Sequence, residues 1–140
     1  MSEKPKKTIM LWIISILLIF VGIGSIASHM ILVSGSVPLP DEEILYFESL
    51  TIIDHILAII PKIIALSSGI LLVLGRKLGS PLILLTLVAN IFFLFYQASL
   101  ENPMSTFSYE SIMPALIITT ALYVGAFLYT NTLVRVGILK

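Results

Sequence analysis

The sequence predicts an all-α membrane protein: a four-helix antiparallel bundle with a short extracytoplasmic surface helix, forming one domain over residues 1–140. Hydrophobic residues make up 58% of the chain and charged residues 11%, with a mean hydropathy of +1.09. These values lie far outside the range of soluble globular domains. Four apolar stretches are each long enough to cross a hydrocarbon core about 30 Å thick. Acidic and basic residues also occupy different connections between these stretches.

The first predicted helix covers residues 8–33 and contains no charged residue. Ser25-Ile26-Ala27 matches the small-x-small pattern of a signal-peptide cleavage site, so a cleaved signal peptide is one interpretation. The apolar run from Ile9 to Ala27 is longer than the hydrophobic region of a usual signal peptide, which favours an uncleaved membrane helix. Ser34–Pro40 ends this helix. Asp41 then predicts the N-cap of a short surface helix, from Glu42 to Leu50.

The second and third predicted helices, residues 52–75 and 81–98, form a hairpin. Gly75 can adopt the left-handed conformation that ends the first of them. Ser80 and Pro81 suit the N-cap and first position of the next. A loop with Asn102-Pro103 leads to the fourth predicted helix, residues 111–134, which places Pro114 in its first turn.

The charged residues predict the topology. Cytoplasmic segments carry an excess of Lys and Arg, so the ends and the hairpin turn should be cytoplasmic, in a bacterial inner membrane. The other two connections are acidic and should be extracytoplasmic. The cytoplasmic basic residues are Lys4, Lys6, Lys7, Arg76, Lys77, Arg135 and Lys140, and the extracytoplasmic acids are Asp41, Glu42, Glu43, Glu48, Glu101 and Glu110, with Asp54 at the boundary.

Each predicted helix also carries one stripe of small or polar residues at steps of three, four or seven. Such residues share a helix face, and in lipid that face is expected to pack inward. The stripes are Thr8, Ser15, Gly22 and His29; Thr51, His55, Ala58, Lys62, Ala65 and Gly69; Gly79, Thr86, Asn90, Phe93 and Gln97; and Ala115, Thr119, Tyr123, Ala126 and Thr130.

Lys62 is the first candidate for a ligand or partner site, because a charge inside a membrane helix costs at least about 2.5 kcal/mol on insertion scales. Its side chain leans toward the outer end of its helix. It could serve a ligand, extend to the outer interface, or pair with Asp54. The hairpin places it near the level of Asn90, which could accept a hydrogen bond from it.

His29 and His55 both lie on their stripes near the outer boundary, close to the level of Asp54. Two histidines beside an acid could bind a metal or relay protons. No metal-binding spacing accompanies them, so no metal site is predicted. The sequence contains no catalytic triad spacing, phosphate loop or dinucleotide fingerprint, no cofactor is predicted, and a net charge of zero indicates no nucleic-acid partner.

The arrangement resembles the DoxX-like group of small four-helix bacterial membrane proteins. The resemblance covers the first helix, the acidic outer loop, and Ile63–Lys77, a helix rich in small residues that ends in Leu-Gly-Arg. The second helix of that group often carries an acidic residue where this chain has Ala65 or Ser67 and Ser68. The resemblance implies a link to quinone-associated oxidoreductase complexes, and no catalytic residue is carried over.

Three functional hypotheses follow. The first is a non-catalytic accessory or binding subunit, in a homo-oligomer or a larger membrane complex. The second is a transport or permeation module in which Lys62, Asn90, His29 and His55 line a polar cavity that opens outward. The third is a quinone-linked redox subunit, supported by the resemblance alone.

Overall fold

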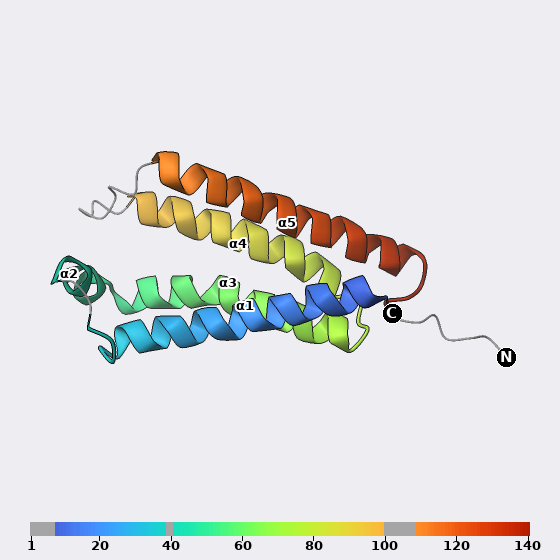
Figure 1. The fold of residues 1–140 in the computed structure, drawn as a ribbon, viewed down its shortest axis with the longest axis horizontal. Helices are drawn as coiled ribbons and strands as arrows, with labels where there is room; N and C mark the ends of the chain where they lie inside the picture. Colours follow the sequence, from blue (N-terminus) through green and yellow to red (C-terminus); the bar gives the residue numbers. More distant parts are fainter. Residues whose placement is uncertain (1–7, 39–40, 100–108) are drawn as a thin grey trace.

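The computed structural model describes residues 8–38, 41–99 and 109–140. Every regular element within these ranges is a helix (Figure 1). Four of the helices contain segments long and apolar enough to cross a membrane, all except α2. The predicted all-helical fold with four helices long and apolar enough to span a membrane is therefore confirmed. The helices are α1 (Ile9–Val33), α2 (Asp41–Ser49), α3 (Ile52–Val73), α4 (Gly79–Ser99) and α5 (Tyr109–Arg135).

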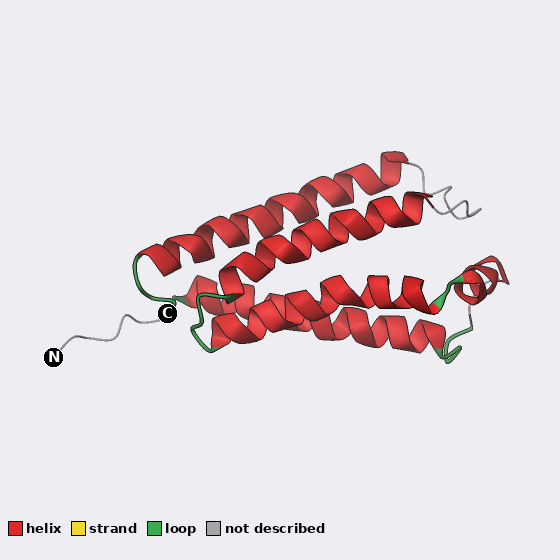
Figure 2. Cartoon of the chain, turned by 180° about the vertical axis from the view of Figure 1, so that it is seen from behind, coloured by secondary structure: helices red, strands yellow, loops and turns green. Residues whose placement is uncertain are grey.

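α3 occupies the central position in the packing. It contacts α1 and α4, and α5 packs mainly against α4. Figures 1 and 2 show that the pair α1 and α3 meets the pair α4 and α5 where the C-terminus lies, and that the two pairs draw apart toward α2. We call these two ends of the molecule the tail end and the α2 end.

Two helices stop at the tail end in the same way. Gly75 and Gly137 have φ angles of +77° and +76°, which glycine adopts without a steric penalty. After α3, the N–H of Gly75 bonds to the Leu72 carbonyl and that of Arg76 to the Leu71 carbonyl. These paired bonds satisfy carbonyls that a helix end would otherwise leave free. The predicted role of Gly75 is confirmed.

The predicted start of α4 is wrong by two residues. α4 begins at Gly79, because the N–H groups of Gly79 and Ser80 already bond to the carbonyls of Arg76 and Lys77. Ser80 is therefore inside the helix and is not its N-cap. Pro81 becomes the third helical residue, where a missing N–H still costs no intrahelical bond.

The predicted start of α5 is also late by two residues. α5 begins at Tyr109, so Pro114 is inside the helix and beyond its first turn. At this position the proline lacks the N–H that would bond to the carbonyl of Glu110.

α1 and α3 approach each other most closely at two glycines. A Cβ atom at Gly22 would lie 2.8 Å from Cβ of Leu66, and one at Gly69 would lie 2.8 Å from the Ser15 carbonyl oxygen. Small residues let helix backbones come this close in a bilayer, where van der Waals contact replaces the hydrophobic effect as the driving force. The inward orientation predicted for Ser15, Gly22, His29, Ala65 and Gly69 is confirmed, because all five are buried.

The apolar core lies in the half of the molecule near the tail end. Its residues come from four helices and from the C-terminal tail, where Leu139 is 2% exposed. Two backbone hydrogen bonds of 2.9 Å hold this tail against the turn between α3 and α4, from Lys77 N–H to the Lys140 carbonyl and from Lys140 N–H to the Gly75 carbonyl. The core consists of Leu11, Ile14, Leu18, Leu72, Ile83, Leu133 and Leu139.

Buried hydroxyl groups in this half all have hydrogen-bond partners. Ser15 donates to the Leu11 carbonyl at 2.7 Å, and Thr86 donates to the Leu82 carbonyl at 2.8 Å. Ser68 reaches the carbonyl of Gly79 at 2.7 Å and so joins α3 to the start of α4. These hydroxyls therefore hold helices in place and are not available to a ligand.

The glycine contact predicts opposite effects for two Gly→Ala changes. Gly24→Ala adds a methyl group with nothing within 4 Å and should stabilise the protein by about 0.5–1 kcal/mol, because alanine favours a helix over glycine. Gly69→Ala meets backbone atoms of Ser15 and Ile19 at 2.8 and 3.0 Å and should destabilise by about 1–3 kcal/mol, as overpacking does. Unfolding of the purified protein in mixed detergent micelles measures both, and a stabilising Gly69→Ala would contradict the described contact.

Candidate functional site

The α2 end begins with a fully hydrogen-bonded carboxylate at the start of α3. Thr51 is the N-cap, and its hydroxyl accepts a hydrogen bond of 3.3 Å from the Asp54 N–H. Oδ2 of Asp54 in turn accepts from the Thr51 N–H at 2.6 Å and from its hydroxyl at 2.7 Å. The other oxygen, Oδ1, accepts from the Tyr96 hydroxyl of α4 at 2.6 Å. Asp54, which is 7% exposed, therefore joins the ends of α3 and α4.

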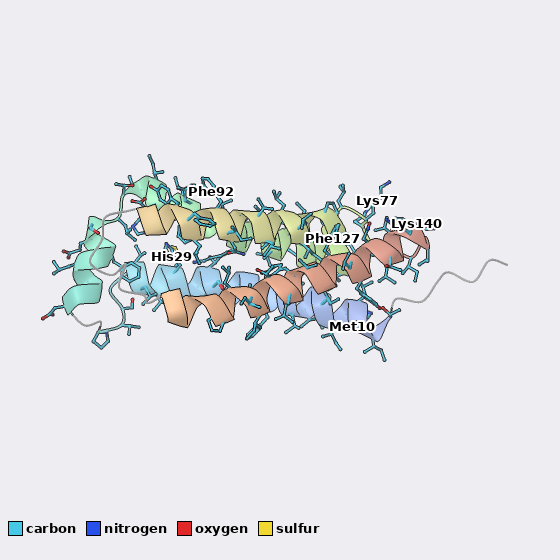
Figure 3. All side chains as sticks on the ribbon, turned by 90° about the horizontal axis from the view of Figure 1, so that it is seen from above. Met10, His29, Lys77, Phe92, Phe127 and Lys140 are labelled. Atoms are coloured by element: carbon cyan, nitrogen blue, oxygen red, sulfur yellow. The ribbon has the colours of Figure 1, made fainter. Side chains whose placement is uncertain are left out.

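The next residue of α3 joins it to α1. Nδ1 of His55 lies 3.3 Å from Nε2 of His29, and the two rings meet edge to face with centroids 5.4 Å apart. His29 is buried, and Figure 3 shows it at the α2 end of α1. A hydrogen bond between two imidazoles needs one nitrogen to donate and the other to accept. The structure thus brings together the two histidines that the sequence singled out.

Asp54 and His55 contact different helices because consecutive residues of an α-helix point about 100° apart. The Asp54 side chain faces α4, and the His55 side chain faces α1. The first turn of α3 therefore fixes both of its neighbours. This explains why Asp54 does not act as the counter-ion that the sequence suggested for Lys62.

Lys62 lies two turns along α3 on the side that faces α1. It follows His55 by seven residues and precedes Gly69 by seven, and both of those residues contact α1. Lys62 is half-buried. In the part of the chain that the structure describes, no hydrogen bond or ion pair to its ammonium group is present, including the one expected with Asp54.

Asn90 of α4 is half-buried in the same half of the molecule. The hydrogen bond expected between Asn90 and Lys62 is not found among the described residues. Two hydrogen bonds join α3 to α4 on either side of this region. Ser68 bonds to Gly79 toward the tail end, and Tyr96 bonds to Asp54 toward the α2 end. Interpolation between them places the backbone of Lys62 about one helical turn nearer the tail end than Asn90.

A feature that the sequence reasoning missed is Pro61, in the middle of α3. Its ring nitrogen carries no hydrogen, so the carbonyl of Leu57 lacks its usual intrahelical donor. In a membrane helix such a carbonyl needs another partner, from a neighbouring helix, a side chain or water. Pro61 directly precedes Lys62. A proline inside a predicted helix leaves the carbonyl four residues earlier without its donor, so the sequence alone could have indicated the Leu57 carbonyl as an additional acceptor.

The described residues contain no group of three His, Cys, Asp or Glu side chains that could hold a metal ion. The only acid next to either histidine in the sequence is Asp54, which directly precedes His55. Its oxygens accept hydrogen bonds from Thr51 and Tyr96. The candidate site near the α2 end is therefore a set of hydrogen-bonding side chains that includes one cation, Lys62.

Comparison with known protein families, curated proteins and solved structures finds no match to this chain. Its function is therefore inferred from its own residues.

The hydrogen bond between Tyr96 and Asp54, which we call the Asp54 junction, predicts that substitutions at these two residues have coupled effects on stability. Tyr96→Phe should lower the unfolding midpoint, because it removes a donor to a carboxylate. Tyr123→Phe is the matched control, since the Tyr123 hydroxyl has no hydrogen bond to another described residue. In an Asp54→Ala background, Tyr96→Phe should lower the midpoint by less than it does in the wild-type chain. Detergent unfolding of the single and double variants measures the coupling, and fully additive losses would contradict the junction.

Proposed function

We propose that this chain is a four-span protein of a bacterial inner membrane, folded as an antiparallel bundle with both ends in the cytoplasm and α2 on the outer surface. The described helices supply four spans of 18 to 25 residues. The distribution of charge supports the orientation, because basic residues gather at the tail end and acids at the α2 end. The basic residues of the described tail end are Arg76, Lys77, Arg135 and Lys140, and the described acids of the α2 end include Asp41, Glu48 and Asp54.

We further propose that the protein is a non-catalytic binding or accessory subunit whose site lies in the half near the α2 end. The observation that carries this proposal is the half-buried side chain of Lys62, whose ammonium group has no partner among the described residues. A membrane protein tolerates such a charge where it faces a cavity or a partner, because lipid cannot solvate it. Near the tail end, by contrast, the buried hydroxyls of Ser15, Ser68 and Thr86 all donate to carbonyls.

The composition of this site indicates the chemistry of its ligand. Lys62 offers only donors, and in the bonded pair of imidazoles the ring that accepts keeps an N–H donor on its other nitrogen. These groups suit an anionic or carbonyl oxygen, carried by a small molecule or by a side chain of a partner subunit. His29 and His55 bond to each other, so they complete a binding surface and do not form a base beside a nucleophile.

A transport module is the second candidate, and the half-buried polar side chains of Lys62 and Asn90 favour it. The core near the tail end opposes it, because Leu72, Ile83 and Leu139 are at most 2% exposed and occupy the route to that end. Transport would require this core to open. Substrate-dependent flux through liposomes of the purified protein would favour transport over binding.

The topology can be tested with single cysteines, because the natural chain contains none. Gly35→Cys, in the connection after α1, should react with a membrane-impermeant thiol reagent added to intact cells. Leu78→Cys, in the turn before α4 and 61% exposed in the native chain, should react only after the membrane is opened. Labelling of Leu78→Cys in intact cells would overturn the proposed orientation.

The outward-facing polar site predicts a difference between two neighbouring positions. Lys62→Cys should react with a small water-soluble thiol reagent added from outside, because the site admits water. Ile63→Cys lies at the same depth but replaces a side chain that is 50% exposed to the surroundings of the bundle. It should stay unreactive in lipid, where the thiolate does not form. Equal reactivity at both positions would contradict an outward-facing site.

The binding role makes a separate prediction for Lys62→Met. This variant should unfold at the wild-type midpoint or above, because removing an unpaired buried charge can stabilise a protein. It should also lose any subunit that co-purifies with the wild-type protein, whereas Ile63→Met should retain it. A Lys62→Met protein that keeps the complete complex would show that the charge is not part of the binding site.

A further inference from the structure

The turn between α3 and α4 and the C-terminal tail form one surface at the tail end. The backbones of Lys77 and Lys140 are paired through a 2.9 Å hydrogen bond, and Lys140 also bonds to Gly75. Leu139 anchors the tail in the core at 2% exposure. The side chains of Lys77 and Lys140 are both exposed, and Figure 3 labels both residues at the tail end.

Basic side chains predominate on this surface. Four exposed basic residues lie at the tail end, and none of them has an ion pair with another described residue. Between Asp54 and Glu101 the sequence contains no acid, and none follows Glu110. The surface, which we call the basic face, consists of Arg76, Lys77, Arg135 and Lys140.

Apolar side chains surround the basic face. Leu74 is 64% exposed, and Leu78 and Val136 are each 61% exposed. They lie next to Arg76, Lys77 and Arg135 in sequence, at the ends of the predicted spans. Cations alternating with exposed apolar groups match the boundary between lipid headgroups and acyl chains. A soluble acidic peptide would match the charges but would leave the apolar groups in water.

We propose that the basic face is a binding site for the headgroup phosphate of an anionic phospholipid. The exposed cations of the basic face attract the phosphate, while the exposed Leu74, Leu78 and Val136 contact the acyl chains. Juxtamembrane basic residues attract anionic lipid in this way. This inference depends on the chain being embedded in a bilayer, and it is independent of the binding role proposed for Lys62.

The single tryptophan provides the readout. Trp12 lies in the second turn after the N-cap of α1 and is 43% exposed. The Thr8 hydroxyl at that N-cap contacts the Tyr129 hydroxyl of α5, which places the start of α1 at the tail end. Leu11, next to Trp12, shares a core cluster with Leu139, so Trp12 lies at the depth of the basic face. Brominated acyl chains quench tryptophan fluorescence on contact.

The experiment titrates the purified full-length chain, in detergent micelles, with dibrominated phosphatidylglycerol or dibrominated phosphatidylcholine. Phosphatidylglycerol should quench Trp12 at a lower mole fraction. Lys77→Gln and Lys140→Gln should each weaken its apparent affinity about fivefold, and the double variant should show no preference over phosphatidylcholine. The fold should persist, because the pairing uses backbone atoms. Glu48→Gln, an exposed position at the α2 end, is the charge control and should keep the preference.

Competition identifies the source of the phosphate. Glycerol phosphate and a hexaglutamate peptide, each added at the lipid concentration, should not displace phosphatidylglycerol, because neither has acyl chains. Displacement by either one would overturn the assignment to lipid and indicate a soluble anion or an acidic partner. Equal quenching by the two lipids in the wild-type protein, or an unchanged preference in the double variant, would overturn the site itself.

Discussion

The close approach of α1 and α3 at Gly22 and Gly69 is the contact on which the rest of the structure depends. Lipid tails are as apolar as leucine side chains, so helices in a bilayer gain little from burying leucine against leucine. They associate through short van der Waals contacts and hydrogen bonds. Cβ atoms at these glycines would lie 2.8 Å from atoms of the opposite helix. Because Gly22 and Gly69 carry no side chains, the backbones of α1 and α3 come close together. This close approach allows His29 and His55 to contact each other near the α2 end.

α3 can organise the bundle because it is buried on two faces. One face contacts α1 through Gly69 and His55, and the other contacts α4 through Asp54 and Ser68. Lys62 lies on the face toward α1, between its two contact points. Its charge is therefore held inside the bundle by its position on the helix, and a long side chain on the lipid face would not be constrained in this way.

The two halves of the molecule are stabilised differently, and this difference has functional meaning. Close-packed leucines and satisfied hydroxyls hold the tail end together. Near the α2 end, hydrogen bonds of Asp54 and of the two histidines join neighbouring helices, and Lys62 and Asn90 stay half-buried. A rigid half that supports a polar half is a suitable arrangement for presenting a site to a ligand or partner.

Residue spacing alone was enough to predict the four candidate spans, the glycine-terminated end of α3 and the inward position of His29 and Gly22. These features depend on composition or on the helical repeat, which a sequence contains directly. The contact between Asp54 and Tyr96 could not be predicted, because it depends on how α4 is rotated relative to α3. The pairing of Lys140 with Lys77 uses backbone atoms and leaves no pattern of side chains to recognise.

The most direct test of this account measures the two ends of the bundle by pulsed electron spin resonance in nanodiscs. Spin labels at Ile13 and Leu128 report on α1 and α5 toward the tail end, and labels at Met30 and Ile117 report on the same helices toward the α2 end. All four native side chains are at least 46% exposed, so labels should not disturb the packing. We predict a narrow distance distribution for the first pair and a broader one for the second. Equally narrow distributions would contradict a tail end that is packed more tightly than the α2 end.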